Sequence, residues 1–209
     1  RGVEIRGMVD RKIGFFSSLT ETQAHLPLYA MEYGRLPGYN IVPHQGFWKG
    51  YKTNGVDFFE ARGYIDFSIS KSIWMQFGHE RTYVGTGYRS LIYSDFAPPS
   101  QFLRANVKVW KLNYLFQLNR MTANNYGTNQ QLYPDKYMAF HHLSFNIGKK
   151  FNLGFFESVI FSPQDSINGG TFELSYLNPV IFYRAIEQQN GSADNVLLGL
   201  DWKWLIRPG

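Results

Sequence analysis

The residues best suited to chemistry lie near the middle of the chain, in residues 78–95, which read GHERTYVGTGYRSLIYSD. Cations, carboxylates and phenols of this kind bind anions and sugars through charge-assisted or bidentate hydrogen bonds. The GTG run has the spacing of neither phosphate-binding fingerprint, and no Lys-Ser/Thr pair follows it. We therefore predict a general ligand-binding segment, whose candidate residues are His79, Arg81, Tyr88, Arg89 and Asp95.

A second group of charged residues lies toward the end of the chain, and its candidate binding residues are Glu157, Arg184 and Glu187. Two carboxylates on either side of a glycosidic bond can hydrolyse it by acid–base chemistry. Several acids within one stretch do not define such a pair, however, and ion pairing with Arg184 is the favoured use. The segment is therefore predicted to bind rather than to catalyse.

Neither a metal site nor a cofactor site is predicted. His141 and His142 are adjacent in an apparent strand, so they point to opposite faces and cannot chelate one ion together. The chain has no cysteine and no HExxH motif, which leaves little from which to build a zinc site.

One pair of residues is compatible with a hydrolytic enzyme. His142 and Ser144 share a strand face, and their spacing resembles that of the His and Ser of the outer-membrane phospholipase. Nucleophilic catalysis also needs a third group that orients the base, and the chain has no GxSxG elbow. We therefore predict that the protein is not an enzyme and keep a phospholipase-like activity as the least favoured alternative.

The composition excludes several classes of protein. Aromatic residues make up 18% of the chain and charged residues also 18%, and cysteine is absent. These values exclude disorder, collagen and a disulfide scaffold. No apolar run reaches the roughly 18 residues of a membrane-spanning helix, and the mean hydropathy is −0.29. A membrane β-barrel remains compatible with this composition.

The charge balance does not point to nucleic acid. Lys and Arg number 21 and Asp and Glu 16, which gives a net charge of +5 and a pI near 9.3. The basic residues are scattered or in short pairs, without a basic run or a recognisable binding motif. We therefore predict no nucleic-acid partner.

Strict alternation of apolar and polar residues is the dominant pattern. In residues 57–68, Phe59, Ile65 and Phe67 alternate with polar residues such as Glu60 and Arg62. Segments of about 9–11 alternating residues are typical of tilted membrane strands. The same alternation predicts further strands within residues 3–10, 13–20, 73–77, 103–109, 112–119, 139–147, 151–155 and 196–204.

The connections between these segments alternate in length. Tight polar turns are predicted at 10–12, 70–72, 110–111 and 148–150, and long connectors at about 22–56, 80–101, 122–135 and 162–194. Short turns at one end and long loops at the other are the signature of an outer-membrane barrel. We therefore predict an all-β fold, an antiparallel transmembrane β-barrel, with a β-sandwich as the alternative.

Residues 1–209 are assigned to one barrel domain. About nine strands are predicted, and bacterial single-chain barrels have even strand numbers. We therefore expect the chain to be part of a larger barrel. Residues 176–189 are expected to form a short helix within their connector, with Pro179 at its first position.

The alternation also assigns the two faces of the strands. The apolar residues are expected to face lipid. The charged residues are expected to face the lumen and to neutralise one another, because an Arg or Lys facing lipid at mid-bilayer costs about 2–4 kcal/mol. The predicted lumen set is Glu60, Arg62, Asp66, Arg104, Lys108 and Asp201. Residues 78–95 are also expected to fold into the lumen and pair with these charges, which is compatible with a ligand role.

Three stretches resemble the capsule-assembly (Wzi-like) family of outer-membrane barrels, in its Bacteroidetes form, which includes gliding-motility proteins. They are residues 77–91, residues 174–195 and the opening RGVEIRG. The resemblance implies a non-enzymatic protein of the bacterial outer membrane that binds or helps to assemble surface polysaccharide. It also implies an alternative, a subunit of a gliding-motility or protein-secretion complex. The implied partners are membrane lipid, polysaccharide and other envelope proteins, and the resemblance assigns no sugar site.

Overall fold

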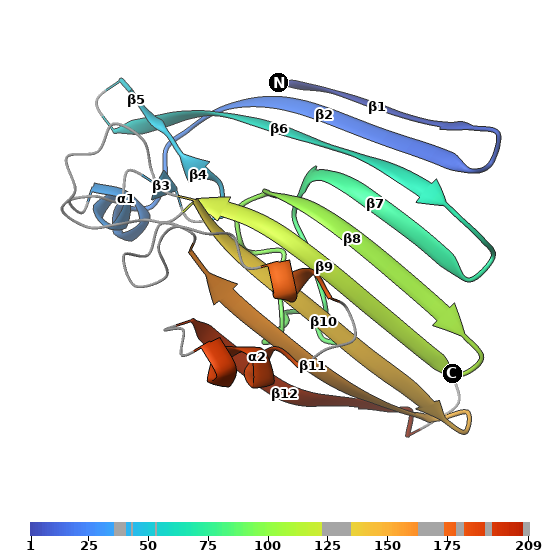
Figure 1. The fold of residues 1–209 in the computed structure, drawn as a ribbon. Helices are drawn as coiled ribbons and strands as arrows, with labels where there is room; N and C mark the ends of the chain where they lie inside the picture. Colours follow the sequence, from blue (N-terminus) through green and yellow to red (C-terminus); the bar gives the residue numbers. More distant parts are fainter. Residues whose placement is uncertain are drawn as a thin grey trace.

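The computed structural model describes residues 1–35, 41–42, 44–52, 54–122, 135–162, 174–178, 182–190 and 194–206. Most of these residues belong to one antiparallel sheet (Figure 1). Its long strands are β1 (Gly2–Val9), β2 (Ile13–Ala24), β6 (Gly55–Ser68), β7 (Ile73–Glu80), β8 (Ser100–Val109), β9 (Leu112–Thr122), β10 (Asp135–Ile147), β11 (Phe151–Phe161) and β12 (Asn195–Trp204). The short elements are α1 (Leu28–Arg35), β3 (Ile41–Val42), β4 (Gly46–Phe47), β5 (Lys49–Tyr51), the 3-10 helix η1 (Leu174–Leu177) and α2 (Tyr183–Asn190).

The long strands follow one another in space in the order of the sequence, from β1 at one edge to β12 at the other. Each long strand pairs antiparallel with its neighbours, and β5 adds a short pairing to β6. The all-β, antiparallel prediction and all the predicted strand segments are therefore confirmed. Within the described part of the chain, β1 and β12 do not pair with each other, so the sheet is open there.

The two ends of the sheet differ as the sequence predicts. The tight turns lie together at one end, and the long connectors lie at the other (Figure 1). The turns contain residues with positive φ, among them Asp10 (49°), Arg11 (54°) and Trp110 (53°). The first long connector is shorter than expected, because β2 continues to Ala24 and β6 begins at Gly55. Most of the connector expected at 122–135 lies outside the described residues.

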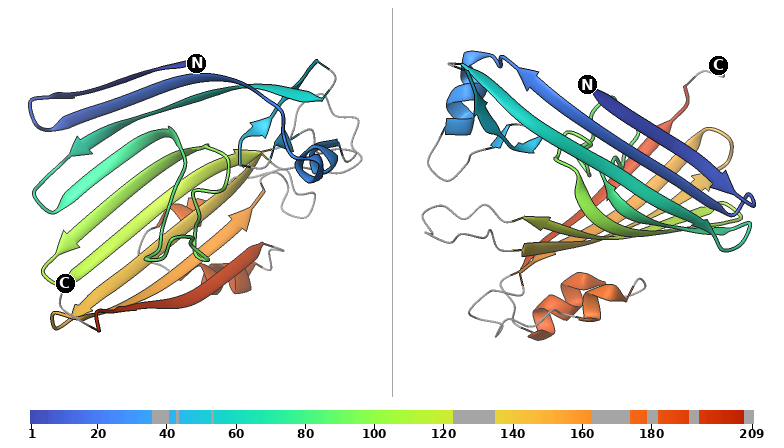
Figure 2. Two further views of the ribbon diagram at one scale, coloured as in Figure 1. Left: turned by 180° about the vertical axis from the view of Figure 1, so that it is seen from behind. Right: turned by 90° about the horizontal axis from the view of Figure 1, so that it is seen from above.

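The sheet has one polar and one apolar face, and its curvature makes the polar face concave (Figure 2). Residues in register across a sheet lie on the same side of it. One such row joins Asp66, Gln76, Arg104 and Gln117 across four strands. The six charged residues predicted to share a face do so, on this concave side. The convex side carries the exposed apolar residues, including Phe59, Leu103 and Leu198.

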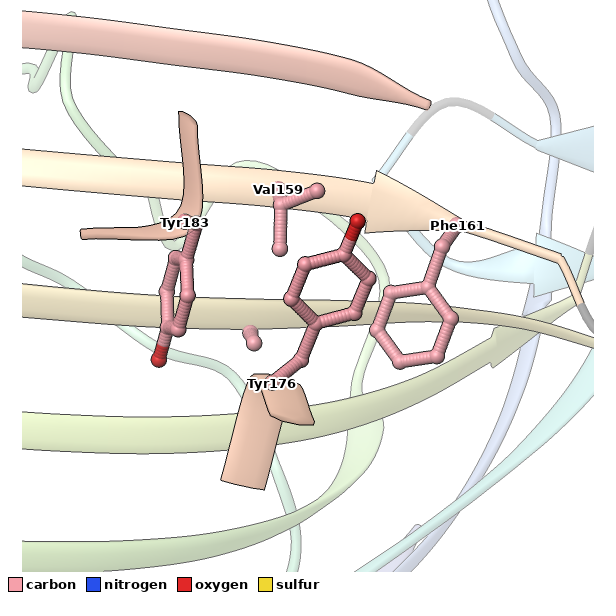
Figure 3. Close-up of a cluster of buried hydrophobic side chains, with 5 residues drawn as sticks. Val159, Phe161, Tyr176 and Tyr183 are labelled. Carbon is pink, nitrogen blue, oxygen red and sulfur yellow. The ribbon is translucent and has the colours of Figure 1, made fainter. Parts of the chain in front are cut away.

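The buried apolar residues form small clusters where connectors cover the sheet. On the concave side, Val84 of the connector 81–99 packs against Met138 and Phe140. On the convex side, Tyr176 of η1 and Tyr183 of α2 pack on β10 and β11 (Figure 3). The two connectors therefore cover opposite faces of the sheet (Figure 2).

The helices within the described residues are short. The expected helix in the last connector is present as α2, although it begins later than predicted and Pro179 lies outside the described residues. None of the helices in the described ranges has the length and apolar character needed to cross a membrane.

Two glycines provide a test of how tightly the strands pack. Gly78 lies opposite Tyr64 in the register, and a Cβ there would come 2.3 Å from the Gly63 oxygen and 2.5 Å from the Tyr64 Cβ. A Cβ at Gly50 would have no atom within 4 Å. We expect Gly78→Ala to lower the free energy of unfolding by about 1–3 kcal/mol, and Gly50→Ala to change it by less than about 0.5 kcal/mol. Urea titration of both variants measures this, and equal stabilities would contradict the packing.

Candidate functional site

A hydrogen-bond network of Arg104 and neutral side chains fixes the connector 81–99 to the concave face. The Thr82 Oγ1 accepts hydrogen bonds from the Arg104 Nη2 and the Gln117 Nε2, each at 2.9 Å. Gln117 also donates to the Asn119 Oδ1 at 2.7 Å, and Asn119 donates to the Tyr93 hydroxyl at 2.9 Å. Burial raises the pKa of Tyr93, so its phenol stays protonated at neutral pH. The network holds the connector at both Thr82 and Tyr93.

Ion pairs hold the first residues of this connector. Arg81 pairs with Glu60 of β6 and donates a second hydrogen bond to the Gln45 Oε1 at 3.0 Å. Arg62 bridges Glu60 at 2.8 Å and Glu80 at 3.2 Å. The predicted pairing of this segment with Glu60 and Arg62 is therefore confirmed. Arg81 lies within this cluster and joins three separate parts of the chain.

The expected mutual neutralisation of the concave charges is only partly correct. The guanidinium of Arg104 bonds to neutral groups, the side chains of Gln76, Thr82 and Gln117. Each of its three nitrogen atoms thus donates to a neutral side chain, and no ion pair of Arg104 is present among the described residues.

Beyond Arg81, an exposed cluster forms at the long-loop end of the sheet. The guanidinium carbon of Arg89 lies 4.6 Å from the ring centre of Phe96 and 5.7 Å from that of Tyr88. Phe96 stacks on His44 with 5.0 Å between ring centres, and the His44 Nδ1 lies 2.9 Å from the Phe96 carbonyl oxygen. Tyr88 is 93% exposed. We call His44, Tyr88, Arg89 and Phe96 the rim platform.

The rim platform includes two predicted residues and two that the sequence did not reveal. Tyr88 and Arg89 were predicted, and the predicted Asp95 is exposed directly before Phe96. Phe96 directly follows the predicted segment. An aromatic residue this close to Arg89 in the sequence is only a weak indication of a cation–π contact. His44 comes from another connector, and no local pattern links it to Phe96. Aromatic faces beside a guanidinium can stack on a sugar ring and hydrogen-bond its acidic or hydroxyl groups.

His79, a candidate residue of the predicted binding segment, lies apart from the other candidates of that segment. Strand β7 continues to Glu80, so His79 is still part of the strand. It lies opposite Gly63 and Gln101 in the register, which places it on the convex face. Strand alternation therefore separates His79 from the rim platform.

Glu157 occupies a different site, on the convex face beneath α2. Its carboxylate accepts hydrogen bonds from the backbone N–H groups of Tyr183 and Arg184, both at 2.9 Å. It also hydrogen-bonds to the His141 Nε2 at 3.0 Å, and Glu157 is only 1% exposed. Because α2 begins at Tyr183, the carboxylate caps the positive end of the helix.

Glu157 contacts Arg184 through the backbone N–H at the start of the helix. The predicted ion pairing of the Arg184 side chain stays a prediction. The Arg184 side chain is exposed on the convex side, away from Arg81 and Arg89. The three arginines therefore do not form one site. Glu187 belongs to α2, but its side chain lies outside the described residues.

Aromatic packing completes the attachment of this connector. Tyr183 stacks on His141 with 4.6 Å between ring centres, and Tyr176 meets Tyr183 edge to face at 5.6 Å. The Tyr176 hydroxyl donates to the Asp194 Oδ2 at 2.8 Å. Figure 3 shows Val159 between the two tyrosines and Phe161 beside Tyr176. These contacts hold residues 174–178 and 182–190 on the convex face.

His142 and Ser144 do lie on one face, as predicted, with His141 on the other. The His142 Nε2 lies 2.7 Å from the Asp201 Oδ1, so an acid does contact this imidazole. Among the described residues, however, no hydrogen bond joins His142 to the largely buried Ser144. The same ranges contain no group of three His, Cys, Asp or Glu residues able to hold a metal ion.

Comparison with known proteins gave no match to a protein-family model, to a curated protein or to a solved structure. The resemblance to the capsule-assembly family therefore stays a prediction. The fold itself defines an all-β protein with one curved antiparallel sheet, a polar concave face and an apolar convex face.

The capping role of Glu157 can be tested directly. Glu157→Ala leaves two N–H groups of α2 without their acceptor, so we expect a loss of about 1–3 kcal/mol in the stability of the docked segment. Hydrogen exchange of residues 183–190 measures this change. Glu4→Ala is the matched control, because Glu4 forms an exposed pair with Arg6. Unchanged protection in Glu157→Ala would show that the cap does not hold the helix.

Proposed function

We propose that this sheet is a sector of an outer-membrane β-barrel whose long-loop end binds cell-surface polysaccharide. The observation that supports the membrane placement most strongly is the apolar convex face. Large apolar residues on it, such as Phe59, Ile65, Phe155 and Leu200, are between 43% and 66% exposed. Exposed apolar area costs about 25 cal/mol per Å² in water, and soluble proteins rarely leave a large continuous patch of it.

The two faces favour a barrel over a sandwich. A β-sandwich covers its apolar face with a second sheet. In the described part of the chain, only residues 174–178 and 182–190 cover the convex face. Polar side chains and the connector 81–99 cover the concave face. This arrangement is apolar outside and polar inside, as in membrane barrels. Further strands pairing with β1 and β12 would close the barrel.

The rim platform supports the polysaccharide part of the proposal. It lies among the long connectors, which are extracellular in bacterial outer-membrane barrels. It presents the exposed Tyr88 ring, the Phe96 ring and the Arg89 guanidinium within one cluster. The buried network below it fixes the connector, so the platform is largely preorganised. Such a surface suits an acidic or hydroxyl-rich polymer.

A second candidate function is a role as a subunit of a gliding-motility or protein-secretion complex. Leu174 and Phe182 favour it, because these residues of the convex connector are 69% and 70% exposed. Such side chains could contact another envelope protein. Co-purification of envelope proteins without any glycan affinity would support this alternative.

Membrane placement predicts opposite environments for neighbouring residues. We expect spin labels on cysteines at Phe59, Ile65 and Val107 to be accessible to oxygen and shielded from a water-soluble nickel chelate in reconstituted vesicles. The adjacent Lys108 on the concave face is the control and should show the reverse. Water accessibility at all three convex positions would exclude the barrel.

The rim platform predicts charge-dependent binding of a glycan. We expect Arg89→Ala to weaken binding of alginate, an acidic polysaccharide, by about tenfold, because charge-assisted hydrogen bonds contribute about 1.5–3 kcal/mol. Binding by the unmodified protein should fall with added salt. Arg11→Ala, at the tight-turn end, should have no effect. Isothermal titration with alginate, and with neutral dextran for comparison, measures this. Equal affinities for both variants would exclude the platform.

A further inference from the structure

The convex face contains a groove that the rim platform does not involve. It has a volume of about 1030 Å³ and lies on β9–β12 beside the start of α2. Its floor includes Leu143, Phe155 and Leu200, which are consecutive partners in the register, and Leu198. Phe182, directly before α2, also lines it. Phe182 and the start of α2, which is docked on the sheet, therefore form one wall of the groove.

Two of the ionisable groups that line the groove are hydrogen-bonded to each other. Glu157 and His141 both line it. The Glu157 carboxylate already accepts hydrogen bonds from the two N–H groups of α2, and His141 hydrogen-bonds to the same carboxylate. A charged or strongly polar ligand would therefore find little to bind. Apart from the Tyr114 hydroxyl, the remaining side chains of the lining are aliphatic or aromatic, which suits an alkyl chain.

A buried hydroxyl group, that of Tyr183, lies beside the groove. The Tyr183 ring stacks on the lining residue His141, and the Tyr183 hydroxyl is buried without a hydrogen-bond partner among the described residues. Figure 3 shows this hydroxyl pointing away from the cluster that Tyr176 and Phe161 form. A buried hydroxyl without a partner is costly, and an ester or carboxyl oxygen could accept its hydrogen bond.

We propose that this groove binds one acyl chain of a membrane lipid. The inference rests on the proposed membrane placement, because the groove is continuous with the apolar convex face through Leu198 and Leu200. Apolar pockets of about 300–1,000 Å³ with a few placed polar groups are typical ligand sites. An acyl chain in a groove contacts the wall as well as the floor. We therefore expect its residence time there to exceed that on the flat surface around it.

Photolabelling tests this proposal. The full chain is reconstituted in phosphatidylethanolamine vesicles that contain phosphatidylcholine with a diazirine in its acyl chain, and adducts are mapped by peptide mass spectrometry. We expect adducts at groove residues to exceed those at Leu103, an exposed residue of the same face outside the groove, by about tenfold.

Two variants alter the groove in different ways. Leu198→Trp fills it and Phe182→Ala removes its wall, so each should lower the groove adducts to the level at Leu103. The matched controls are Leu103→Trp and Leu174→Ala, an exposed residue of the same connector, and neither should change the groove adducts. Because Phe182 is 70% exposed, its replacement should not impair folding.

The outcomes separate the groove from the membrane placement. Labelling of Phe59 and Ile65 without enrichment in the groove would overturn the acyl-chain site and leave the barrel intact. Absence of adducts over the whole convex face would overturn both proposals. Cross-linking of the groove to a protein in native membranes, in place of lipid, would also overturn the acyl-chain site.

Discussion

The register of the antiparallel sheet is the constraint on which the rest of this structure depends. The row from Asp66 through Gln76 and Arg104 to Gln117 places polar side chains side by side on one face. Because side chains alternate along a strand, this row also places Ile65, Phe77 and Leu103 together on the other face. A slip of one residue in any strand would exchange its two faces and bring charges into the apolar surface.

The polar face and its connector depend on each other. Arg104 has its donors satisfied by glutamine side chains and by Thr82, which belongs to the connector. Without Thr82 the sheet would keep a partly buried guanidinium with fewer partners, and without the sheet the connector would lose its attachment. Tyr88 and Arg89 lie between Thr82 and Tyr93, the two positions at which the network attaches the connector. Such an attachment would preorganise the proposed binding surface.

The convex face shows how a buried carboxylate can be accommodated in apolar surroundings. Burying a charge costs several kcal/mol unless it is paired and hydrogen-bonded. Glu157 meets this requirement through the start of α2 and through His141. The same contacts hold α2 against the sheet, and the groove beside Phe182 is a consequence of that docking. Fold and candidate lipid site therefore share one origin.

The sequence by itself determined where the strands and tight turns lie, the end of the sheet at which each connector lies, and the face of the residues within the predicted strands. These features follow from the period of two and from local turn chemistry. Only the tertiary structure decided which face each connector covers. It joined Phe96 to His44 and Glu157 to α2, and it separated His79 and Arg184 from Arg89. The physical reason is that the contacts of Phe96 with His44 and of Glu157 with α2 join segments far apart in the chain. No local sequence pattern predicts such contacts.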